Sequence, residues 1–250
     1  MLWKKEFKAH RWKYIVAFVI LIILAITLVW QFPFIKNLLE QGGLEGMPGW
    51  MIEGVEAQRD FSFFLASNWF DKNLLQISVI LSILLGMSVV AQEVEDNTLE
   101  FLLSRPFSRR QIFISKTLSQ LVFIIIVIFI PTLMLGMSGI IFGYEVHFLR
   151  LIIGIVPVMA TLFIVYNLAL LFSLYLDDQI RSGLAVLLLI AVIWGLSFID
   201  SLSFLNIFAY GEVTSYYVQG NFPFLNLMLL LIIGGVVYSL SYYRFLRRDF

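Results

Sequence analysis

The chain has 250 residues, of which 60% are hydrophobic and only 14% are charged, whereas a soluble domain has about 25% charged residues. Basic and acidic residues number 17 each, so the net charge is zero and indicates no nucleic acid or acidic partner. No cysteine is present, which excludes disulfide bonds, thiolate metal sites and cysteine nucleophiles. Several apolar runs reach the roughly 18 residues that cross a bilayer, so the composition predicts an integral membrane protein.

The N-terminal stretch MLWKKEFKAHRWKY combines aromatic and basic side chains. Trp3, Phe7 and Tyr14 are spaced so that they share one face of a helix. We expect an interfacial helix here, with its aromatic rings among the lipid headgroups. A basic flank that only sets the topology fits the same residues. The long apolar run that follows has no small-residue cleavage site, which argues against a cleavable signal peptide.

Six apolar runs predict six membrane spans, and no repeat divides the chain, so we expect one domain over 1–250. The predicted spans are about 14–34 (ending at Pro33), 73–91, 117–142 (kinked at Pro131), 149–175 (with Pro157 inside), 182–198 and 223–243. Two longer segments connect spans on the outer side. Within 35–72, the stretch 61–73 suits an interfacial helix, and 199–222 is predicted to form short half-helices.

Lysine and arginine gather on one side of these spans. Thirteen of the 17 fall in the N-terminal flank, in 93–116, in the 176–181 link and near the C-terminus. Because positive charge marks cytoplasmic segments, both termini and the 93–116 segment are predicted to be cytoplasmic. The segments 35–72 and 199–222 are then outside.

The segment EVEDNTLEFLLSRPFSRRQIFISK (93–116) holds eight of the 34 charged residues. Its acids come first, where negative charge stabilises the start of a helix. Pro106 ends that helix, and Ser108 is a good N-cap for the next one. The pattern predicts a short cytoplasmic helix at about 93–104, with a leucine edge and charges that suit docking to a soluble partner. A plain solvated loop is the alternative, but it leaves the acids unexplained.

This segment resembles the loop between the second and third spans in permease subunits of bacterial type 2 ABC exporters. That loop has a glutamate, Gly-Thr-Leu-Glu, two or three leucines, Pro-x-Ser-Arg and a later lysine. The present chain has Asn97 at the glycine, and asparagine also tolerates positive φ. The six-span layout, the basic amphipathic start and the closing Arg-Arg-Asp-Phe match as well, so the resemblance covers most of the chain.

The resemblance implies that the segment is a coupling helix, held in a cleft of a separate ATP-binding subunit whose closure tilts the second and third spans. The implied contact residues are Glu93, Glu95, Asp96, Thr98, Leu99, Glu100, Leu102 and Leu103. The implied exit turn consists of Arg105, Pro106, Ser108 and Arg109. ATP and Mg²⁺ would bind to the partner, since this chain has no G-x-x-x-x-G-K-[ST] sequence. No cofactor or metal site is expected in the chain itself.

Three other classes were weighed. A membrane-embedded enzyme is disfavoured, because the two histidines, His10 and His147, form no H-E-x-x-H motif. A lone channel or carrier would show charges or broken helices near the midplane of its spans. An ATPase-coupled signalling or immunity module, which moves no cargo, is the alternative that stays open. Asp200 and Glu212 could attract a cationic cargo at the exit, although loops expose charge by default.

We therefore expect an all-α permease subunit in the bacterial cytoplasmic membrane, surrounded by lipid and without nucleic-acid partners. A second permease chain, identical or paralogous, would complete the path, and a two-fold pair is the default. Its phenylalanine- and leucine-rich spans would suit an amphipathic or hydrophobic cargo, such as peptide toxins or antimicrobial peptides.

Overall fold

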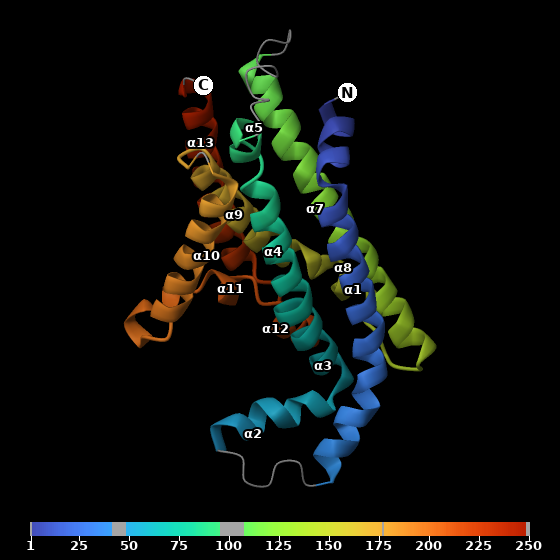
Figure 1. Ribbon diagram of the computed structural model, residues 1–250. Helices are drawn as coiled ribbons and strands as arrows, with labels where there is room; N and C mark the ends of the chain where they lie inside the picture. Colours follow the sequence, from blue (N-terminus) through green and yellow to red (C-terminus); the bar gives the residue numbers. More distant parts are fainter. Residues whose placement is uncertain (1, 42–48, 96–107, 177, 249–250) are drawn as a thin grey trace.

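The computed structural model describes residues 2–41, 49–95, 108–176 and 178–248, which form helices joined by short links (Figure 1). Within these ranges, six helical stretches are long and apolar enough to cross a membrane, which confirms the predicted all-α architecture. Their bounds are Glu6–Glu40, Phe61–Gly86, Arg109–Ile141, Phe148–Ser173, Gln179–Leu196 and Phe224–Arg247. Both chain ends lie at the same end of the bundle as α5 (Ala91–Glu95), and we call this the loop end.

Helix α1 (Leu2–Glu40) runs without a break from the basic start through the first span. This corrects two expectations, because no separate interfacial helix forms and Pro33 lies inside α1 rather than at its end. Phe7 and Tyr14 do share a face, with ring centroids 6.3 Å apart, but this face packs on protein. Both rings lie 5.0 Å from Phe123 of α7 (Arg109–Ile141), and this contact holds the start of α1 in line with the rest of the helix.

The second span begins at Phe61 rather than near residue 73, so the expected interfacial helix is instead part of the span. It consists of α3 (Phe61–Asn68), the π-helical turn η2 (Trp69–Leu74) and α4 (Leu75–Gly86). Trp69 and Phe70 are fully buried. The Trp69 indole N–H donates to the Thr132 hydroxyl of α7 at 3.1 Å, which satisfies its polar atom inside the bundle.

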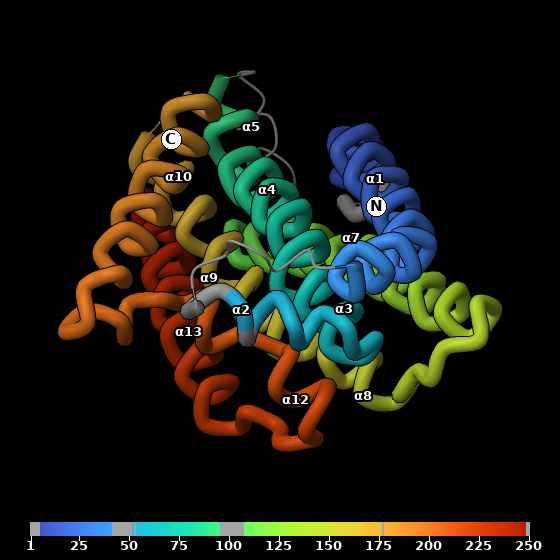
Figure 2. The backbone as a smooth tube through the Cα atoms, turned by 90° about the horizontal axis from the view of Figure 1, so that it is seen from below, coloured from blue at the N-terminus to red at the C-terminus, as the bar shows by residue number. Residues whose placement is uncertain are grey.

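Helix α9 (Ile155–Ser173) packs against α4, α10 (Gln179–Leu196) and α13 (Phe224–Arg247), as Figures 1 and 2 show. It continues the short α8 (Phe148–Ile153) after Gly154. A Cβ atom on Gly86 of α4 would lie 2.5 Å from the Tyr166 carbonyl oxygen, so the backbones of α4 and α9 touch there. By contrast, α10 and α13 leave many large apolar side chains exposed, as expected of helices that face lipid or another apolar surface.

The two segments expected on the outer side contain short helices. The first holds α2 (Gly49–Glu56) and η1 (Ala57–Arg59). The second holds η3 (Asp200–Leu205), α11 (Ile207–Tyr210) and α12 (Thr214–Gln219), which confirms the expected short helices in 199–222. Helix α12 packs on α3 and α8, so this segment returns to the bundle rather than standing away from it. We call α12 and its contacts the α12 region.

Candidate functional site

Most of the predicted coupling helix lies outside the residues that the structure describes. The predicted residues outside them are Asp96, Thr98, Leu99, Glu100, Leu102, Leu103, Arg105 and Pro106. Four predicted residues are described: Glu93 and Glu95 before this gap, and Ser108 and Arg109 after it. The geometry of the site is therefore the geometry of the two ends of the 96–107 loop.

The two described acids of the loop face in different directions. Glu95 is exposed at the end of α5, where a partner can reach it. Glu93 is 8% exposed, and its carboxylate forms an ion pair with Lys116 of α7 at 2.8 Å. The structure thus places Glu93 at the base of the loop, turned into the bundle, and Glu95 on its surface.

The other end of the loop starts α7 in the predicted way. The Ser108 hydroxyl accepts from the Gln111 backbone N–H at 3.2 Å, and the Gln111 side chain accepts from the Ser108 N–H at 3.0 Å. This reciprocal capping box satisfies two N–H groups at the helix end. The Arg109 guanidinium donates to the Arg248 carbonyl at 2.7 Å, and so attaches this end of the loop to the end of α13.

A buried lysine connects the start of the loop to other helices. The Lys116 ammonium is 3% exposed and donates to the Val89 carbonyl at 3.0 Å and to the Glu93 carboxylate at 2.8 Å. The Glu6 carboxylate of α1 lies 3.4 Å from the same nitrogen. An ammonium has three N–H donors, and here it meets three acceptors from α1, from α5 and from the turn between α4 and α5.

The polar contacts continue from Glu6 into the bundle. Its second oxygen lies 3.7 Å from the His10 Nε2 atom and accepts from the Gln120 amide at 3.5 Å. The Gln120 side-chain carbonyl in turn accepts from the Tyr166 hydroxyl of α9 at 2.9 Å. We call Glu93, Lys116, Glu6, Gln120 and Tyr166 the loop-end network, and it joins α5, α7, α1 and α9.

The carbonyl end of α4, just before this network, is also closed by side chains. The Lys13 ammonium of α1 donates to the Leu84 carbonyl at 2.9 Å. The Ser88 hydroxyl donates to the Leu85 carbonyl at 2.7 Å. Because the last carbonyls of a helix lack partners within the helix, these donors and Lys116 fix the turn that leads from α4 to α5.

The sequence reading missed the loop-end network because it counted Lys116 among the positive charges that set topology. A signal was available in the same segment. With Ser108 as the N-cap, Lys116 falls two helical turns inside α7. A lysine at that depth in an apolar helix needs an acidic partner, and Glu93 is one of the four acids that precede it in the segment.

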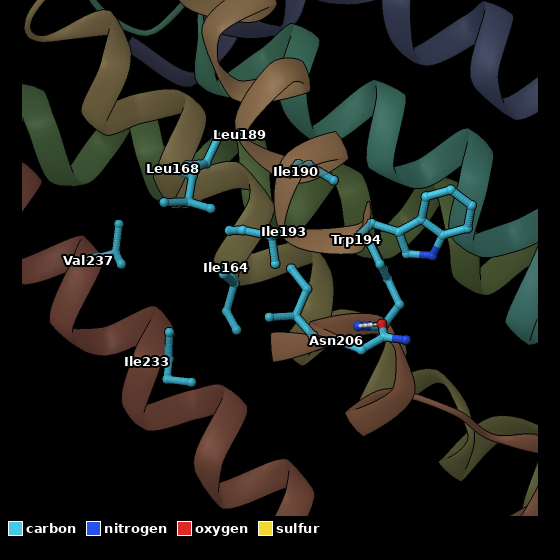
Figure 3. Close-up of a pocket in the computed structure, with 11 residues that line it drawn as sticks. Ile164, Leu168, Leu189, Ile190, Ile193, Trp194, Asn206, Ile233 and Val237 are labelled. Atoms are coloured by element: carbon cyan, nitrogen blue, oxygen red, sulfur yellow. Dashed lines mark hydrogen bonds between the residues drawn. The ribbon is translucent and has the colours of Figure 1, made fainter. Parts of the chain in front are cut away.

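Two apolar hollows lie along α10, away from the loop end. One, of about 170 Å³, is enclosed by α9, α10, α11 and α13 (Figure 3). Its lining includes Ile164, Leu168, Ile193, Trp194, Ile233 and Val237. The polar side chain at its edge, Asn206, is engaged in capping α11, since its oxygen accepts from the N–H groups of Phe208 and Ala209 at 3.2 Å.

The second hollow, of about 480 Å³, lies between α4 and α10 and has Asp71 and Gln76 on its wall. The Asp71 carboxylate accepts from the Val213 N–H at 2.9 Å and from the hydroxyl and N–H of Thr214, and so caps the start of α12. Nearby Glu212 is exposed; partial loss of hydration, and then the negative charge of Asp71, raise the pKa of its carboxyl. Among the described residues, no three acids or histidines are placed to hold a metal ion.

Six apolar spans, with the two described ends of the 96–107 segment attached to the bundle through Glu93 and Arg109, define a multi-pass membrane protein. The family model described as "ABC-2 family transporter protein" matches residues 1–250, the whole chain. The chain therefore belongs to the ABC-2 transporter family. It is a transmembrane transporter subunit, not itself catalytic, and the family implies an ATP-binding partner. A comparison with curated proteins gave no match.

Proposed function

We propose that this chain is the permease of an ATP-driven exporter and that the 93–108 loop docks a separate ATP-binding subunit. The observation that carries the proposal is the anchoring of both ends of this loop. Its start is tied to α7 and α1 through Glu93 and Lys116, and its end is tied to α13 through Arg109. A displacement of the loop is thus passed to several membrane helices at once.

The predicted contacts of the coupling helix stay part of this proposal. Glu95 is exposed and available to a partner, while Glu100 and Leu99 belong to the portion inferred from sequence alone. ATP and Mg²⁺ would be held by the partner, because the chain lacks a phosphate-binding P-loop sequence. With both termini and the loop on the cytoplasmic side, the chain would reside in the bacterial cytoplasmic membrane.

The proposed cargo is amphipathic or hydrophobic, such as a peptide toxin or an antimicrobial peptide. The two hollows along α10 support this class, since apolar side chains line the first almost entirely and line the second apart from Asp71 and Gln76. A second permease chain, identical or paralogous, would face the exposed apolar side chains of the spans and complete the path. Lipid would cover the remaining apolar surface.

The first experiment is a gentle detergent purification of the tagged chain from its native membrane, with Glu100→Lys beside it. We expect a soluble ATPase to co-purify in stoichiometric amount with the wild-type chain and to be lost from the variant, because a reversed charge opposes docking. Glu145→Lys is the matched control, since Glu145 is exposed on the link between α7 and α8, far from the loop. Isolation of the wild-type chain alone and inert would overturn the docking role.

Reconstitution into vesicles then tests export. With ATP supplied on the side of the loop, a labelled cationic amphipathic peptide should accumulate on the opposite side, and Glu100→Lys should abolish this movement. If ATP is hydrolysed at the same rate with every cargo offered and none moves, the exporter assignment fails. The ATPase-coupled signalling module would then be the better description.

A further inference from the structure

Lys116 is placed to do more than neutralise a buried charge. Its three acceptors come from three separate pieces of the chain: Glu6 on α1, Val89 in the turn after α4, and Glu93 on α5. A lysine that only balanced one buried charge would need one carboxylate, with backbone carbonyls for its other N–H groups. Here one ammonium is shared between the N-terminal helix and the first residues of the loop.

The burial of this group makes the arrangement demanding. Lys116, Glu6 and Glu93 are each less than 9% exposed, and removal of one partner from such a set leaves a charge that water cannot reach. The contacts of Lys116 with Glu6 and with Glu93 are therefore expected to form together and to break together. Separation of α1 from α5 would break the Lys116–Glu6 or the Lys116–Glu93 contact.

The polar contacts also extend from Glu6 into the bundle, so they indicate which helices a displacement of the loop would reach. From Glu6 they pass through Gln120 to the Tyr166 hydroxyl of α9. The Tyr166 backbone carbonyl lies against Gly86 of α4. The loop-end network thus begins at the base of the loop and ends where α4 and α9 touch.

We propose that Lys116 is a positioning residue that makes α1 and α5 move with α7 as one unit, so that displacement of the loop moves the N-terminal helix. This inference rests on the proposed docking role of the loop for its function. The physical linkage itself is a property of the single chain. On this proposal, α1 is a moving part of the transporter rather than a passive anchor.

The linkage can be measured directly, because the chain has no cysteine and new ones can be labelled singly. Lys8 on α1 is exposed, Gln92 on α5 is half-buried, and neither is a predicted contact of the coupling helix, so spin labels at Lys8→Cys and Gln92→Cys report the α1–α5 separation. In lipid nanodiscs, we expect one narrow distance distribution, unchanged when the ATPase complex is arrested with ATP bound. Glu6→Gln, which removes the negative charge that α1 presents to Lys116, should broaden the distribution.

A variant that lacks all three charges of this set separates the effect on helix linkage from the effect on stability. In Glu6→Gln/Glu93→Gln/Lys116→Met, the three charges of this set are removed together, so thermal stability should recover toward the wild type. The spin-label distance should nevertheless stay broad, and cargo moved per ATP hydrolysed should fall roughly tenfold, which lies within the usual range of coupling between two sites of a protein. Lys72→Met, at an exposed lysine of η2, should change neither quantity.

Two outcomes would overturn the linkage: a triple variant with wild-type distances, or one that moves as much cargo per ATP as the wild type. These results are distinct from failure of the proposed function. If no ATPase binds the wild-type chain, the docking role is lost, yet the distances in nanodiscs still decide whether Lys116 joins α1 to α5.

Discussion

The loop end and the α12 region both place charged side chains inside the bundle, but they use them differently. At the loop end, Lys116 joins two carboxylates, so charged side chains of different helices meet one another. In the α12 region, Asp71 accepts from backbone N–H groups at the start of α12. The Arg150 guanidinium donates at 3.0 Å to the Tyr217 and Val218 carbonyls at its end.

The two regions differ in the groups with which their charged side chains pair. A carboxylate at the start of α12 and a guanidinium at its end complement the partial charges of the helix termini, so they hold a six-residue helix in place. The charged contacts of the α12 region therefore stabilise the position of one short helix. The loop end instead links α1, α5 and α7 through long side chains, and one broken contact there affects several helices.

Lys116→Met should cause the largest loss of stability. It leaves the Glu6 and Glu93 carboxylates buried without their cation, which costs about 3–5 kcal/mol in comparable buried pairs. Thermal unfolding of the detergent-purified chain measures this loss. The control is Lys72→Met, where the exposed lysine makes one contact, to the Asn68 side chain at 3.3 Å. Equal melting temperatures for both variants would show that the loop end does not depend on its buried charge.

Asp71→Ala should rank second, and its effect should be local. It leaves the Val213 and Thr214 N–H groups without their acceptor, at a cost of about 1–3 kcal/mol. Hydrogen exchange should rise in 207–219 and stay unchanged in α5 and α7. Asp200→Ala is the control, because Asp200 is exposed and caps nothing in the bundle. Faster exchange at the loop end would mean that the two regions are coupled rather than independent.

Gly86→Ala and Gly211→Ala compare the two regions by packing instead of charge. A Cβ on Gly86 meets the Tyr166 backbone, which cannot rotate away, so we expect a loss of about 1–3 kcal/mol. At Gly211 the Cβ meets the Thr161 hydroxyl, a side chain that can turn, and the loss should be smaller. Gly235→Ala, with open space around it, should instead stabilise α13 by about 0.5–1 kcal/mol. Melting temperatures that rank otherwise would contradict the close α4–α9 approach.

Hydropathy was enough to predict six spans, and the local residue pattern was enough to predict the N-cap at Ser108, because each depends on residues near one another in sequence. Short half-helices in 199–222 were only one fold that the sequence allowed. The start of the second span was missed, since a window that counts polar residues penalises Asn68, Asp71 and Lys72. In the structure, the Asp71 carboxylate accepts from the Val213 N–H at the start of α12, so this charged side chain is paired within the protein.

The loop-end network could not be predicted from residues near one another in sequence. Glu6 and Lys116 are 110 positions apart, and nothing local to either residue reveals the other. Periodicity correctly placed Phe7 and Tyr14 on one face, but whether that face meets lipid or α7 depends on tertiary packing. The coupling helix at 93–104 stays a prediction, drawn from its sequence pattern and from the family to which the chain belongs.

Glu212→Gln should give the smallest change in stability, and the dependence of that change on pH tests whether the pKa of Glu212 is raised. The pKa of Glu212 is raised above its ordinary value of 4.5, so at neutral pH the ionised carboxylate is held less favourably in the folded state than in the unfolded one. The variant should therefore melt slightly higher than the wild type at pH 8, by about 0.5 kcal/mol or less because the group is exposed. As the pH falls through the raised pKa, the wild type takes up its proton and recovers the difference. A difference between the variant and the wild type that grows on acidification would show that the pKa of Glu212 is not raised.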